Sequence, residues 1–276
     1  MNAVDGSDHY SKTSDEPPPS LLTIILDTNP HAWALLAPTL PLSAAIANLL
    51  VFINAHLAFN NANKVCVIAS HTRRAEFLYP PRPTPPTTTT TNNAPDDSSD
   101  DEAMPDPSPS PPKKHSQTLL DDANHYRPFT HLQRTLLSAL STLFATTNSD
   151  TLTATTAIAG ALTLALTYIN KQQLLASATV SGPASSSTTN TDAATTTQQS
   201  PGLISRILIL SVSGDLAHQY IPLMNTIFAC QRMAIPIDIA KISGDTVFLQ
   251  QASDATGGVY IKIKQPKGLL HILLAA

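Results

Sequence analysis

The chain has 276 residues, of which 42% are hydrophobic and 13% charged, and its formal net charge is −4. This length and apolar content suit one large domain, while 23 prolines against 9 glycines indicate polar, proline-rich insertions. Two acidic segments, residues 1–19 and 80–118, hold the negative excess, so the remainder carries about +2 and lacks the dense Lys/Arg stripe of a direct nucleic-acid binder.

The first half of the chain is expected to start with a disordered tail over residues 1–17, which is polar, acidic and unlike a signal peptide. Residues 21–28 form a continuous apolar run that ends in an aspartate, typical of a buried parallel strand. A second strand is expected at residues 63–70, and a short extended piece at 74–80 ends at prolines. Between the first two strands, a helix is predicted by apolar residues spaced three or four apart: Leu42, Ile46, Leu49, Ile53 and Leu57.

Two low-complexity segments, at about 81–118 and 177–202, cannot bury enough apolar surface to offset the entropy of ordering. The pieces on either side are too short to fold alone, so we expect one domain over residues 18–276 that carries both segments as insertions. The other predicted elements are helices at about 129–146 and 151–175, strands at 205–213, 235–242 and 257–263, and helices at about 216–233, 245–255 and 268–276.

Strands that alternate with helices predict an α/β fold with a doubly wound, mostly parallel six-stranded sheet covered by helices on both faces. Residues 74–80 follow the preceding strand after a link too short for a parallel crossover. This strand is therefore expected to pair antiparallel at one edge of the sheet.

The cysteines and the hydropathy pattern indicate the cellular environment in which the chain is expected to fold. Cys66 and Cys230 lie in apolar stretches without a CxxC spacing, which favours buried, reduced thiols over a disulfide. No uninterrupted apolar run reaches the roughly 18 residues of a membrane span, so no membrane contact is expected. Together these features predict an intracellular protein.

The carboxyl ends of the predicted strands are the place to look for a binding site, because ligands of open parallel sheets collect there. Side chains with oxygen or nitrogen atoms are frequent at these ends, and an oxygen-rich set of this kind suits Mg²⁺ in principle. The candidates are Asp27, Asn29, His31, Ser70, His71, Ser213 and Asp215.

Motifs of catalysis are missing from the sequence. No GxGxxG or GxxxxGK[ST] follows the first strand, and there is no GxSxG nucleophile elbow. The nine histidines show no HExxH spacing, and His71 and His218 are interpreted as hydrogen-bonding residues rather than catalysts. Trp33, the only tryptophan, is interpreted as a packing residue, with a partner contact as the alternative.

Four runs of sequence resemble the smaller von Willebrand factor A-type (vWA) subunit of the general transcription and DNA-repair factor TFIIH, the Tfb4-like family. Together they cover about a third of the chain and both ends of the domain. They are IILDTNPHAW (24–33), NKVCVIASHTRRAEFLYP (63–80), QYIPLMNTIFACQRMAIPIDI (219–239) and LQQASDATGGVYIKIKQPKGLLHILL (249–274).

The resemblance implies a vWA-like fold, whose rim can bind a metal ion through an Asp-x-Ser-x-Ser loop. Here Asp27 matches and Asn29 still offers an oxygen, but His31 replaces a hydroxyl ligand. Asp215 lies at a position where the fold usually supplies another acidic residue, and Ser213 stands two residues before it. No clear threonine ligand precedes Asp215 in the sequence. We expect a degenerate rim without metal, with weakly bound Mg²⁺ as the alternative.

The resemblance also implies a nuclear, non-catalytic structural subunit of the TFIIH core that acts in RNA polymerase II initiation and nucleotide excision repair. Its expected partners are other core subunits, chiefly the larger vWA-type subunit through that partner's zinc-binding RING-like region. The family carries a zinc module after the vWA domain. This chain has only two cysteines and is therefore interpreted as a truncated form without that module. No cofactor is expected in the chain itself, and zinc is expected only in the missing module.

Two other functions stay open from the sequence. A metal-dependent adhesion module would capture a carboxylate of its partner through Mg²⁺, and ordered metal at Asp27, Asn29 and Asp215 would favour it. An α/β enzyme without recognisable motifs would show a deep pocket with converging ionisable groups.

Overall fold

The computed structural model describes most of the predicted domain. The acidic tail over residues 1–17 and nearly all of the two predicted insertions lie outside the described residues. The described ranges are 18–81, 128–147, 155–180, 203–214 and 219–275.

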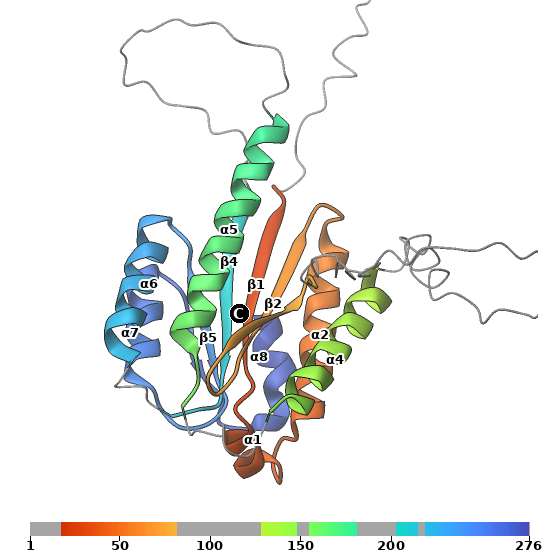
Figure 1. The fold of residues 1–276 in the computed structure, drawn as a ribbon, viewed down its shortest axis with the longest axis vertical. Coiled ribbons are helices and arrows are strands. Elements are labelled where there is room, and N and C mark those ends of the chain that lie inside the picture. The colour runs from red at the N-terminus through yellow and green to blue at the C-terminus, as the bar shows by residue number, and fades with distance from the viewer. Residues whose placement is uncertain (1–17, 82–127, 148–154, 181–202, 215–218, 276) are drawn as a thin grey trace, which may run out of the picture.

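A six-stranded sheet with the order β3-β2-β1-β4-β5-β6 forms the centre of the fold (Figure 1). Strand β3 pairs antiparallel with β2 at one edge, and all other neighbours pair in parallel. The predicted fold class and the antiparallel edge strand are therefore confirmed. The strands are β1 (Ser20–Asp27), β2 (Lys64–Ser70), β3 (Ala75–Tyr79), β4 (Ile204–Ser211), β5 (Ile237–Lys241) and β6 (Tyr260–Lys262).

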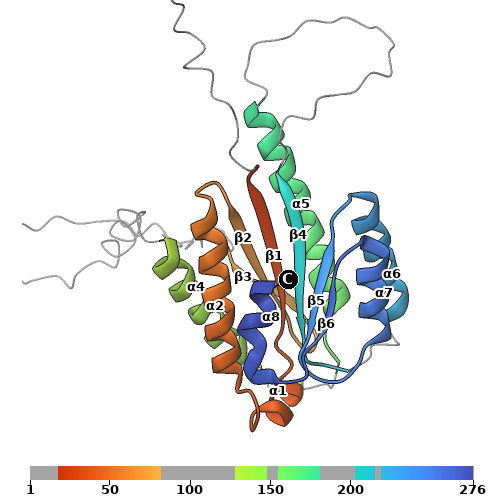
Figure 2. The same ribbon diagram turned by 180° about the vertical axis from the view of Figure 1, so that it is seen from behind.

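Helices cover both faces of this sheet and divide the core in two (Figures 1 and 2). In β1, side chains alternate between the layers: Leu22, Ile24 and Leu26 face one, and Leu21 and Ile25 face the other. The first layer holds α1 (Pro30–Leu36), α2 (Leu42–Phe59), α4 (Pro128–Ala145), η4 (Pro266–Gly268) and α8 (Leu269–Ala275), and the second holds α5 (Ile158–Val180), α6 (Tyr220–Arg232) and α7 (Val247–Thr256).

Element boundaries differ from the prediction where local chemistry decides them. Pro38 and Pro41 separate α1 from α2, because neither proline has an N–H to donate to the helix that precedes it. Helix α5 starts at Ile158 rather than near 151 and continues to Val180, past the start of the expected insertion at 177. Its predicted apolar face is buried as expected.

Helix α2 corrects the expectation about membrane spans. Among the described residues it is the one helix long and apolar enough to cross a membrane, by length and composition alone. Its inner residues Ala45, Ile46, Leu49 and Ile53 are buried against the sheet. The apolar character of α2 therefore has a use inside the domain, and only its outer face remains to be explained.

Candidate functional site

The rim of the sheet, at the carboxyl ends of the strands, is centred on Asp27, the last residue of β1. In Figure 1 this end of the sheet lies near α1. Asp27 is 1% exposed, and its carboxylate accepts three backbone hydrogen bonds. Oδ1 accepts from the N–H of Asn29 at 3.1 Å, and Oδ2 accepts from Val212 at 3.0 Å and Ser213 at 2.8 Å. Asp27 thus joins the loop after β1 to the loop after β4, and both of its oxygens are committed.

The loop after β1 supplies the N-terminal cap of helix α1. Oδ1 of buried Asn29 accepts from the N–H of His31 at 3.1 Å and so caps the helix, whose first residue is Pro30. The side chain of His31 is exposed. Buried Trp33 donates its indole N–H to the carbonyl of Asp27 at 2.7 Å, which confirms the packing interpretation of this tryptophan and fixes the same loop.

Lys241, at the end of β5, is fully buried beside this loop system. Its ammonium group donates to Oγ of Ser211 at 2.9 Å and to the carbonyl oxygen of Ser213. Because the N–H of Ser213 binds Asp27, one peptide segment connects the buried cation to the buried carboxylate. Lys241 was not among the residues predicted for this site; the signal that could have pointed to it is a lysine at the rim end of a fully buried strand.

Four hydroxyl groups around the rim are buried and have no hydrogen-bond partner among the described residues. Buried hydroxyls of this kind are ordinarily satisfied by ordered water. One of them belongs to Thr156, just before α5, which was not among the predicted site residues. The four are Ser70, Thr156, Ser213 and Thr246.

His71 connects the rim to the neighbouring loops through hydrogen bonds. Its Nδ1 lies 3.1 Å from both Oγ1 and the carbonyl oxygen of Thr28, and its Nε2 lies 3.0 Å from Oγ1 of Thr147. Burial lowers the pKa of His71, against the opposing effect of the backbone hydrogen bond with Thr28. The histidine is therefore a neutral cross-link, as predicted, whereas His218 and Asp215 lie outside the described residues.

The described residues of the rim do not fit a Mg²⁺ ion. Mg²⁺ needs oxygen ligands in near-octahedral geometry, but the oxygens of Asp27 and Asn29 already accept backbone N–H groups. A buried ammonium group stands beside them. Within the part of the chain that the structure describes, no three His, Cys, Asp or Glu side chains form a group that could hold a metal.

Comparison with known proteins places this geometry in a family. The profile of the family Transcription factor Tfb4 matches residues 19–276. The chain is 40% identical over 257 residues to the general transcription and DNA repair factor IIH subunit tfb4 of Schizosaccharomyces pombe, covering 93% of this chain and 68% of that protein. The chain belongs to the Tfb4 family. A second relative, the TFB4 subunit of Debaryomyces hansenii, is 35% identical over all of this chain and 75% of its own length.

Solved structures agree with the Tfb4 assignment. The crystal structure of the TFIIH p34 N-terminal domain is 41% identical, with a TM-score of 0.68, over 95% of this chain and 98% of that one. A von Willebrand factor type A protein from Catenulispora acidiphila is 14% identical, with a TM-score of 0.51 over 93% of this chain and 41% of that one, which shows the vWA fold alone. The Tfb4 relatives are named as transcription and repair factor subunits rather than as enzymes.

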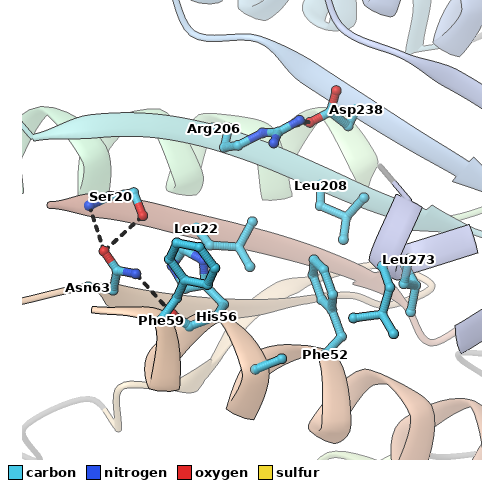
Figure 3. A pocket seen from close by; sticks show the side chains of 12 residues that line it. Ser20, Leu22, Phe52, His56, Phe59, Asn63, Arg206, Leu208, Asp238 and Leu273 are labelled. Atoms are coloured by element: carbon cyan, nitrogen blue, oxygen red, sulfur yellow. Dashed lines mark hydrogen bonds and ion pairs between the residues drawn. The ribbon is translucent and has the colours of Figure 1, made fainter. Parts of the chain in front are cut away.

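A cavity of about 450 Å³ in this Tfb4-family chain lies away from the rim, between the carboxyl ends of α2 and α8 and the strands (Figure 3). The side chain of Arg206 pairs with Asp238 at 2.6 Å, and the other oxygen of Asp238 accepts the N–H of Val259. Burial lowers the pKa of His56, the histidine in the wall. Most of the remaining wall is apolar, and the hydroxyl of Ser20 donates to the side-chain oxygen of Asn63 rather than to His56. Among the described residues, the cavity therefore does not show the converging ionisable groups of an active site.

Both cysteines are free thiols in the core among the described residues. Burial raises the pKa of Cys230 to about 12, and it also raises the pKa of Cys66. Thiols this resistant to ionisation are poor nucleophiles, because the thiolate is the reactive form. They serve packing, as the sequence predicted.

Proposed function

We propose that this chain is a non-catalytic structural subunit of the TFIIH core, acts in the nucleus in RNA polymerase II initiation and nucleotide excision repair, and binds the larger vWA-type subunit. Membership of the Tfb4 family over residues 19–276 supports the assembly. The rim supports the lack of catalysis, because the carboxylate of Asp27 and the ammonium group of Lys241 are committed to holding loops together. What is left to the domain is binding through its helices.

The outer face of α2 is the observation that carries this proposal. The helix has 18 residues and no Asp, Glu, Lys or Arg. A surface helix ordinarily presents charged or polar residues to water. Here an exposed apolar stripe runs along the helix at spacings of three or four and ends at Phe59, which is 85% exposed; its members are Ala47, Val51, Ala55, Ala58 and Phe59.

Such a stripe fits the apolar centre of a lasting interface. Exposed apolar patches on soluble proteins mark interaction sites, and a stable complex buries well over about 1,000 Å². Small alanine side chains let a partner approach the helix closely, while Val51 and Phe59 offer larger contacts. A second exposed pair, Ile221 and Phe228, lies on one side of α6 in the other layer and is the competing contact face.

Binding can be tested by co-expression of this chain with the C-terminal zinc-binding region of the larger vWA-type subunit, followed by size-exclusion chromatography at low and high salt. We expect one complex under both conditions, because salt screens exposed charges and leaves apolar contacts intact. Separate elution of two folded proteins at both salt concentrations would contradict the proposed function.

The contact face is located with matched variants. Val51→Glu places a charge in the stripe, and Val247→Glu places the same charge on exposed α7, where the side chain is 67% exposed. We expect the first to reduce the affinity at least about 10-fold and the second to leave it unchanged. Loss of binding by Phe228→Glu instead would keep the partner and move the interface to α6.

A further inference from the structure

A buried lysine destabilises the folded state unless favourable interactions compensate the desolvation of its charge. Lys241 is the largest fully buried side chain among the described residues. Moving an ammonium group out of water is unfavourable by several kcal/mol even after relaxation of the protein. The neighbouring strand positions are apolar, so an isoleucine or leucine here would fit the pattern of β5. The position of the ammonium group therefore calls for a specific role.

The contacts of Lys241 define that role. Its ammonium group holds the carbonyl oxygen of Ser213 and the hydroxyl of Ser211. The N–H groups of Val212 and Ser213 in the same segment point at the carboxylate of Asp27. The loop after β4 thus lies between a buried cation and a buried anion, with its carbonyl toward the first and its N–H groups toward the second.

We propose that the ammonium group of Lys241 is the resident cation of this rim. It supplies internally the positive charge that a vWA rim otherwise takes from a divalent ion, and it orients the loop after β4 toward Asp27. A dication would have to enter next to a buried positive charge in a medium of low dielectric constant, where like charges repel strongly. The rim is consequently closed to Mg²⁺ by a side chain of the protein itself.

The inference concerns the isolated chain and does not depend on the proposed partner. Thermal unfolding is measured for the wild type, Lys241→Met, Asp27→Asn and the double variant, each with and without millimolar Mg²⁺. Lys262→Met is the matched control, because Lys262 pairs with exposed Asp245 and is half exposed.

We expect Lys241→Met to lower the Tm by roughly 10 °C and the control by at most about 2 °C. Removal of both charges in the double variant should lower the Tm by clearly less than the sum of the two single losses, because both side chains hold the same loop segment and the second substitution acts on a segment that the first has already released. Mg²⁺ should not change the Tm of the wild type.

Three results would overturn the assignment. They are equal losses for Lys241→Met and Lys262→Met, additive losses in the double variant, and stabilisation of the wild type by Mg²⁺. If Lys241→Met does not fold, Lys241→Gln replaces it, since glutamine keeps a hydrogen-bond donor and removes only the charge. Full stability of that variant would likewise show that the charge has no role.

Discussion

The rim and the outer face of α2 differ in how their side chains are used. At the rim, polar groups that could bind a ligand are buried and hold three loops together through Asp27, Lys241 and His71. On α2, the stripe through Val51 and Phe59 carries no polar side-chain atom and is exposed. The rim is interior structure that holds loops in place, whereas the outer face of α2 is the exposed surface proposed for a partner.

The largest expected effect of a rim substitution is on stability. Asp27→Asn replaces an oxygen by an NH₂ group that faces backbone N–H donors, and it weakens the hold on the loop segment that Lys241 also binds. We expect a loss of about 3 kcal/mol in the free energy of unfolding, measured by urea denaturation. Mg²⁺ should change neither protein. Stabilisation of the wild type alone by Mg²⁺ would mean that the carboxylate is a ligand after all.

Trp33→Phe tests the same loop with a smaller change. The phenylalanine keeps most of the buried ring but loses the hydrogen bond to the carbonyl of Asp27, so the stability should fall by about 1–2 kcal/mol. Unfolding must be followed by circular dichroism, since Trp33 is the only tryptophan. A loss as large as that of Asp27→Asn would show that ring packing, rather than the hydrogen bond, fixes the loop.

The positions of the strands along the chain and the buried faces of the helices could be predicted, because both follow from the apolar pattern of the sequence. The run of β1 and the spacing of Ile158, Leu162 and Leu166 each appear in the structure as expected. Boundaries set by a few atoms were not predictable. Gly258, for example, is needed because a Cβ there would lie 1.9 Å from the carbonyl oxygen of Ile237, a contact between segments that periodicity does not show.

The candidate site was predicted in part. Asp27, Asn29 and Ser213 do lie together at the strand ends, because parallel strands bring their carboxyl ends to one edge. The sequence could not show that their atoms bind backbone N–H groups rather than a ligand. It also gave no reason to connect Lys241 with Asp27, since their link runs through the backbone of a third loop.

A pH dependence should appear at the rim and not along the apolar stripe of α2, whose members do not titrate. Burial lowers the pKa of His71 below its ordinary value of 6.5, so the unfolded chain binds more protons than the folded one between the two pKa values. Stability should therefore be full above about pH 6.5 and fall as the pH drops below it. His71→Gln should flatten this decline in urea denaturation at several pH values. His56, whose pKa burial also lowers, will leave a residual slope.

The smallest expected effect on stability belongs to Val51→Glu. The side chain is 50% exposed in the middle of α2, and glutamate is at least as good a helix former as valine. We therefore expect a change within about 0.5 kcal/mol by urea denaturation, although the same variant should lose the partner. Asp27→Asn should do the reverse and bind normally at temperatures where it is folded. If Val51→Glu destabilises the chain as much as Asp27→Asn does, the stripe is part of the packed interior, and loss of binding could no longer be assigned to it.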